Sequence, residues 1–62
     1  MAFVRTRKEI EIGDRVKTTK VHRLEYGYFE VGTEVTVTGI SERGYDIMDD
    51  EGNEMTEIGW TI

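Results

Sequence analysis

The stretch "TEVTVTGI", Thr33–Ile40, gives the clearest secondary-structure signal in this chain of 62 residues. Val35 and Val37 alternate there with polar residues, and a period of two is typical of a β-strand with one buried face. Gly39 follows and permits a bend before the end of the stretch. The pattern predicts a half-buried strand with both valines in the core of the protein.

Short strand candidates, separated by glycine-containing turns, lie on both sides of this stretch. Before it, "DRVKTTKV", Asp14–Val21, has two valines at an odd spacing, which predicts a bulge or bend within the run. After it, the turn "SERG" leads into "YDIMDD", residues 45–50, and "DDEGNE" offers Gly52 and Asn53 for a hairpin turn. No segment keeps a 3.6-residue apolar period for three turns, so we expect no long helix.

The C-terminal stretch "EMTEIGWTI", residues 54–62, changes its apolar register from odd to even positions between Met55 and Ile58. This change predicts one short helical turn, Thr56–Gly59, before a last short strand that contains Trp60. The whole pattern predicts an all-β domain of five short strands with a long first loop. A five-stranded barrel would remove most of the exposed strand edges, and an open sheet that dimerises is the alternative.

Four segments resemble an SH3-like small β-barrel of the bacterial, KOW or Tudor-like kind: "IGDRVKTTK", "YFEVGTEVTVTGI", "RGYDIMDDEGNE" and "IGWTI". Such sequences often begin with G-D-x-V, carry G-T-x-x-x-V at a diverging turn and end a strand with D-x-x-G-N. The resemblance implies a single five-stranded SH3-like barrel over residues 10–62 that acts as a non-enzymatic binding module. Small barrels of this kind also occur among phage and prophage products. The chain has no proline, so the resemblance does not extend to polyproline recognition.

Residues 1–9, "MAFVRTRKE", precede this barrel, and we expect either a disordered arm or an added strand there. Phe3 and Val4 would be unusual in a purely solvating tail, so a weak homodimer through this segment stands beside a monomer as an alternative. No apolar run approaches the roughly 20 residues of a membrane span, and no signal-peptide pattern is present. We therefore expect a cytoplasmic protein with no membrane partner.

Charge is distributed unevenly along the chain, which has a net charge of −5. Residues 1–23 hold seven of the eight basic residues and three acidic ones, whereas residues 24–62 hold one basic residue and ten acidic ones. Opposite charges on paired strands would explain this distribution, and so would a basic face that binds an anionic partner.

Two alternative functions follow from this charge distribution. One is a nucleic-acid-associated module that uses the basic N-terminal half. The other is an acidic phage-type inhibitor that imitates nucleic acid and binds a host nucleic-acid-binding protein. In the nucleic-acid alternative the candidate contacts are Arg15, Lys17, Lys20 and Arg23.

Three aromatic rings lie close together in "EYGYFEVGT", Glu25–Thr33. In an SH3-like barrel the apolar residue three positions before the diverging-turn glycine is usually buried, and the resemblance assigns Phe29 to that position. Alternation then directs Tyr28 to the opposite face, where a tyrosine can pack its ring and keep its hydroxyl in water. The preferred function is therefore a small protein–protein interaction domain that uses an aromatic patch. Its candidate contacts are Tyr26, Tyr28 and Trp60, of which Trp60 is expected to be partly buried.

Catalysis and metal binding are poorly supported by the residue types. The chain has one histidine, His22, one serine and no cysteine, so a nucleophilic pair would rest on single residues about twenty positions apart. His22 is expected to be an exposed loop residue. The acidic segment "DDEGNE" lacks the spacing of a calcium-binding loop and is interpreted as a hairpin turn. We expect no enzymatic activity, no metal and no cofactor.

Overall fold

The computed structural model describes residues 10–62, and within that range the chain forms six β-strands and no helix. The prediction of an all-β domain is therefore confirmed, whereas the expected N-terminal arm, residues 1–9, lies outside the described residues. The strands are β1 (Arg15–Lys17), β2 (His22–Arg23), β3 (Tyr28–Phe29), β4 (Glu34–Ser41), β5 (Gly44–Asp49) and β6 (Glu54–Met55).

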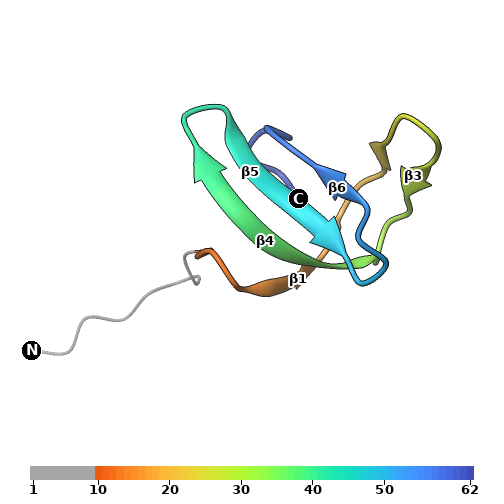
Figure 1. The fold of residues 1–62 in the computed structure, drawn as a ribbon, viewed down its shortest axis with the longest axis horizontal. Coiled ribbons are helices and arrows are strands. Elements are labelled where there is room, and N and C mark those ends of the chain that lie inside the picture. The colour runs from red at the N-terminus through yellow and green to blue at the C-terminus, as the bar shows by residue number, and fades with distance from the viewer. Residues whose placement is uncertain (1–9) are drawn as a thin grey trace, which may run out of the picture.

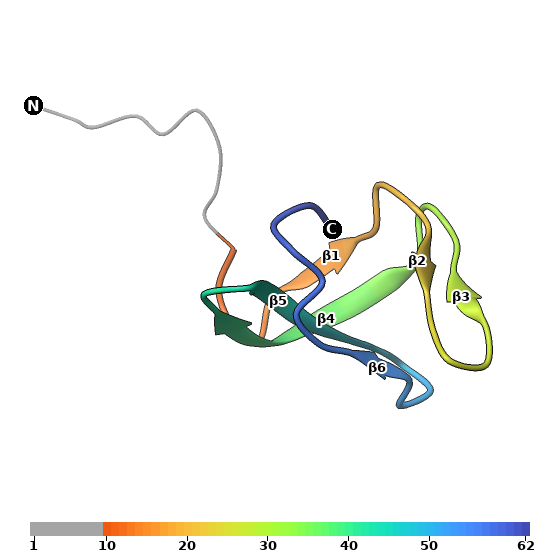
Figure 2. The same ribbon diagram turned by 90° about the horizontal axis from the view of Figure 1, so that it is seen from above.

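Two antiparallel sheets contain these strands (Figures 1 and 2). β1, β4, β5 and β6 form a four-stranded sheet in that order, and β2 and β3 form a separate hairpin. The hairpin is inserted between β1 and β4 in the sequence, where the sequence predicts a long irregular loop. Both views place it at the end of the sheet where β5 turns into β6. The structure therefore has six strands in two sheets in place of the five that were expected.

β4 and β5 form the longest pairing in the domain, around the two-residue turn of Glu42 and Arg43. The register shifts between Val37 and Gly39, so the bend predicted at Gly39 is a β-bulge. A bulge bends its strand and increases the local twist, and both strands are visibly curved in Figure 1.

The core is formed by side chains from β3, β4, β5 and the C-terminal residue of the described range. Phe29, Val35, Val37, Ile47 and Ile62 are buried, with exposures between 0% and 7%. The core positions predicted for Phe29, Val35 and Val37 are therefore confirmed. Burial of one such side chain contributes about 1.5–3 kcal/mol. So small a core leaves the fold dependent on the backbone pairing around it.

The segment after β6 is neither the helical turn nor the strand that its apolar pattern predicts, so both predictions are wrong. Glu57 and Gly59 have φ angles of 52° and 89°, and a right-handed helical turn requires consecutive negative φ angles. The carboxylate of Asp46 accepts a hydrogen bond from Glu57 N at 2.8 Å, which holds this left-handed residue in place. Gly59 then forms an isolated parallel bridge with Gly44. Ile62 reaches the core from this irregular segment.

β1 ends at Lys17, earlier than the predicted strand, because Thr18 turns inward. Thr18 is 2% exposed, and its hydroxyl donates to the carbonyl oxygen of Glu30 at 2.7 Å and accepts from Thr33 N at 3.0 Å. These bonds join the chain after β1 to the turn before β4. The bend predicted within this run is the break between β1 and β2.

His22 is buried in β2 and is not an exposed loop residue, so that prediction is wrong. The register places His22 opposite Phe29, and residues directly opposite in a hairpin share a face, which here packs on the core. Nε2 of His22 donates to the main-chain oxygen of Ile62 at 2.6 Å, because a main-chain oxygen can only accept. Thr19 N donates to the same oxygen at 3.0 Å. The hairpin is thus joined to the end of the described chain.

Candidate functional site

The β2–β3 hairpin has one buried face and one exposed face. Its turn is closed by a hydrogen bond from Leu24 N to the carbonyl oxygen of Gly27 at 2.8 Å. Because strand residues alternate, the partners Arg23 and Tyr28 lie on the face opposite His22 and Phe29. Tyr28 is 58% exposed there, and Tyr26 in the turn is 95% exposed. The hairpin therefore presents two tyrosine rings to solvent.

A groove of about 490 Å³ lies between this hairpin and the turn that joins β5 to β6. One wall is formed by residues 24–29, including both tyrosines, and the other by Asp49 and residues 51–54. No basic side chain is among the described residues that line it, and we call it the acidic groove. Its four carboxylates belong to Glu25, Asp49, Glu51 and Glu54.

A second hollow of about 330 Å³ is lined by the same hairpin. Its lining includes Val21 and Arg23, and no acidic side chain is among the described residues that form it. Three residues line both hollows: Leu24, Gly27 and Tyr28. Tyr28 therefore stands between an acidic and a basic depression.

The far wall of the acidic groove is ordered by hydrogen bonds within the β5–β6 turn. Oδ1 of Asp49 accepts from Glu51 N at 3.0 Å and from Asn53 N at 2.8 Å, and Oδ2 accepts from Asn53 Nδ2 at 3.0 Å. The side-chain hydrogen bond from Asn53, supported by the backbone donors, lowers the pKa of Asp49. Gly52 supplies the positive φ angle, 89°, that the turn requires.

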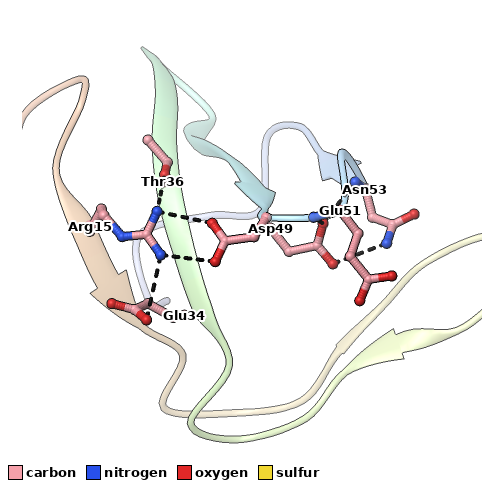
Figure 3. Close-up of polar contacts among 7 residues, drawn as sticks. Arg15, Glu34, Thr36, Asp49, Glu51 and Asn53 are labelled. Atoms are coloured by element: carbon pink, nitrogen blue, oxygen red, sulfur yellow. Dashed lines mark hydrogen bonds and ion pairs between the residues drawn. The ribbon is translucent and has the colours of Figure 1, made fainter.

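Arg15 lies on the edge strand β1 and reaches across β4 to the β5–β6 turn (Figure 3). Its guanidinium donates to both carboxylate oxygens of Asp50, at 2.9 Å and 3.1 Å, and lies 3.4 Å from the carboxylate of Glu34. The bidentate hydrogen bond from Arg15 lowers the pKa of Asp50, and the same bond, with the contact to Glu34, raises the pKa of Arg15. The contacts of Arg15 with Glu34 and Asp50 thus join β1, β4 and the β5–β6 turn.

The Arg15–Asp50 pair is expected to make the stability of the fold sensitive to acid. The pKa of Asp50 is lower in the folded chain than its ordinary value of 3.8. The ionised carboxylate therefore contributes stability to the fold. This stability is fully present above about pH 3.8 and is lost as the pH falls through the pKa of the folded chain. Between about pH 5 and about pH 2, the thermal midpoint of the wild type is expected to fall further than that of Asp50→Asn.

Glu42→Gln is the matched control for this measurement, since Glu42 is exposed in the β4–β5 turn and has no ion pair within residues 10–62. Circular dichroism melts at each pH give the midpoints. Equal acid sensitivity of the wild type and Asp50→Asn would show that the pair does not stabilise the fold.

Trp60 lies near the start of β5, whereas the groove with the two tyrosines lies at the end of this strand. Its ring packs edge-on against Tyr45, with centroids 5.2 Å apart and an interplanar angle of 80°, and it remains 59% exposed. Tyr45 is near the start of β5, whereas the acidic groove reaches Asp49 at its end. Four residues of a strand span about 13 Å. The three aromatic candidates therefore form two sites and not one patch.

The four basic candidates differ in their surroundings. Arg15 is held by two carboxylates, as described above, whereas the other three are exposed and have no ion pair within the described part of the chain. Lys17 lies opposite Glu34 in the β1–β4 register. Lys20 lies in the bend between β1 and β2, and Arg23 lines the second hollow.

Sequence reasoning missed the residues that position the site. His22 holds the inner face of the hairpin, and the Arg15–Asp50 pair holds the β5–β6 turn. The D-x-x-G-N spacing already indicated the Asp49 turn. Nothing local in the sequence indicated the Arg15–Asp50 pair, because its partners are 35 positions apart.

Comparisons with known proteins give no relative from which a function could be inferred. No family model, curated protein or solved structure matches the chain. Within residues 10–62, no cluster of three or more histidine, cysteine or acidic side chains is arranged to hold a metal ion. The same residues contain no helix with the length and apolar character of a membrane span.

Proposed function

We propose that this chain is a non-enzymatic protein-binding module that uses the exposed face of the β2–β3 hairpin and the acidic groove beside it. The observation that carries the proposal is the exposure of Tyr26 and Tyr28, 95% and 58%, on the wall of this groove. Tyrosine is enriched among the residues that dominate protein interfaces, because its ring buries a large area with few rotatable bonds. The carboxylates at the groove would set the orientation of the partner.

We propose further that the two sheets belong to an SH3-like barrel. The antiparallel order of β4, β5 and β6 supports this assignment, as does the insertion of the hairpin between β1 and β4. The return of the C-terminal segment to the start of β5, through the Gly44–Gly59 bridge, supports it as well. The proposed function rests on the hairpin surface and not on this fold assignment.

The nucleic-acid module is the competing proposal. Its support is the exposure of Lys17, Lys20 and Arg23, the last of which lies opposite Tyr28. Arg15 contributes less to it, because its guanidinium already binds two carboxylates. An exposed ring beside a basic side chain could stack on an unpaired base.

Affinity capture from a lysate of the source cell, with and without nuclease, distinguishes the two proposals. The wild type and Trp60→Ala are expected to capture the same specific protein from nuclease-treated lysate. The double variant Tyr26→Ala/Tyr28→Ala is expected to capture at least about tenfold less, as for the loss of interface anchors. Trp60→Ala is the control because it removes an exposed ring at the other end of β5.

Two results would overturn the protein-binding proposal. One is undiminished capture by the double variant. The other is loss of the captured protein on nuclease treatment together with co-purifying nucleic acid, which would favour the competing proposal. Circular dichroism of the double variant checks the fold, since an unfolded variant would show that the tyrosines are structural and not a contact surface.

A further inference from the structure

The exposed face of the hairpin carries opposite charges on its two sides. Arg23 lines the hollow on one side of Tyr28, and the carboxylates of Glu25, Glu51 and Glu54 line the groove on the other. Tyr28, which is 58% exposed, lines both hollows and so lies between them, and Val21, which is 51% exposed, lies beside Arg23 in the second hollow. We call this surface the hairpin patch. It consists of Val21, Arg23, Glu25, Tyr26, Tyr28, Glu51 and Glu54.

Neither charged side of the hairpin patch is neutralised within residues 10–62. The ion pairs in that range join Arg15 to Glu34 and Asp50, and Arg43 to Glu57. None of them involves Arg23, Glu25 or Glu51. Glu54 accepts a hydrogen bond from the hydroxyl of Thr38 at 3.1 Å but has no cationic partner in this range. The charges on both sides are therefore available to a partner.

We propose that the partner of the hairpin patch is a second copy of this chain, bound about a twofold axis close to Tyr28. This inference rests on the proposed function, because it names the partner of the same surface. A twofold interface uses the same patch on both copies, so the patch must be complementary to itself. An apolar centre with a cation on one side and carboxylates on the other meets this requirement.

The twofold arrangement brings each charged side against its opposite. When the axis passes near Tyr28 and is perpendicular to the line from Arg23 to the acidic groove, the rotation places Arg23 of one copy against the acidic groove of the other, and the reverse contact forms at the same time. A uniformly basic or uniformly acidic partner would match only one side of the patch and would repel the other. Charge complementarity therefore favours a second copy over a partner of a single charge sign.

The experiment is sedimentation velocity of the full chain over a concentration range of about 5 to 500 µM, with dissociation constants taken from the concentration dependence. The wild type is expected to show a monomer–dimer equilibrium that weakens as salt is raised. Tyr28→Ala is expected to weaken dimerisation at least about tenfold. Arg23→Glu and Glu25→Lys are each expected to weaken it by about tenfold, because each creates two like-charge contacts.

Mixing the two charge-reversal variants gives the sharpest test. In a mixed dimer of Arg23→Glu with Glu25→Lys, both contacts again join opposite charges, so the affinity is expected to return to within about threefold of the wild type. Arg43→Glu and Glu42→Lys are the matched controls. They make the same charge changes in the β4–β5 turn, at the other end of β5 from the groove, and should leave dimerisation unchanged.

Three outcomes would overturn the inference: a chain that stays monomeric at the highest concentration, dimers that are indifferent to Tyr28→Ala and to both charge reversals, or association that continues past the dimer. The affinity capture tests the proposed function independently of dimerisation. Capture of another protein that depends on Tyr26 and Tyr28, by a chain that remains monomeric, would leave the proposed function standing and remove only the second copy as partner.

Discussion

Gly44→Ala is expected to unfold the chain. A Cβ atom at this position would overlap the carbonyl oxygen, carbonyl carbon and Cα of Gly59, all of which are backbone atoms. The φ angle of 120° is itself in a region that residues with a side chain rarely adopt. The segment after β6 could not keep its bridge to β5, and Ile62 would be withdrawn from the core. We expect a loss of at least about 4 kcal/mol, comparable with the roughly 3–8 kcal/mol available to a domain of this size.

Far-UV circular dichroism with a urea titration measures this effect at 25 °C, with the free energy of unfolding taken from the linear extrapolation. Gly32→Ala is the matched control. Its φ angle is 88°, but a Cβ atom there would meet no atom within 4 Å, so the substitution is expected to cost only about 1–2 kcal/mol, the strain of an L-residue in left-handed backbone. If Gly44→Ala were no less stable than Gly32→Ala, the close approach of Gly44 and Gly59 would not be a feature of the folded protein.

His22→Ala is expected to destabilise the fold by about 2–4 kcal/mol, through the loss of buried volume and of one hydrogen bond. The side chain is 5% exposed and supplies one of the two donors to the main-chain oxygen of Ile62. His22→Gln keeps an N–H donor and is expected to lose less. In the variant with alanine, the hairpin and the C-terminal segment should both show faster amide hydrogen exchange.

Val21→Ala is the control for this prediction, because Val21 precedes His22 in the chain but is 51% exposed. It is expected to change the free energy of unfolding by less than about 1 kcal/mol. A loss in His22→Ala no greater than the loss in Val21→Ala would contradict the assignment of the histidine as a core residue.

The parts of the fold that depend on neighbouring residues could be predicted from the sequence. The alternation of Val35 and Val37 predicted their burial, and the glycine at position 39 predicted the bend that the structure shows as a bulge. The burial of Phe29 was predicted from the SH3-like resemblance, and the alternation of faces along the strand then predicted the exposure of Tyr28.

The parts that depend on distant residues could not be predicted. The apolar register after Met55 resembles a helical turn, but the side chain of Asp46 and the bridge to Gly44 impose left-handed backbone there instead. The charged neighbours of His22 in the sequence favour a solvent-exposed position. Its burial follows only from the pairing of β2 with β3, which places it opposite Phe29. The acidic groove likewise requires the hairpin and the β5–β6 turn to lie side by side, which neither segment specifies alone.

The bonds from His22 and Thr19 to Ile62 make the support of the hairpin depend on the far end of the described chain. His22 and Ile62 are 40 positions apart, so the hairpin cannot gain this support until residue 62 is present and in place. Contacts of such long range carry a high loop-closure cost, and a small domain forms them cooperatively with the rest of its fold. Proteolytic removal of a few residues around Ile62 is therefore expected to weaken the hairpin and, with it, the binding proposed for Tyr26 and Tyr28, which the cut does not touch.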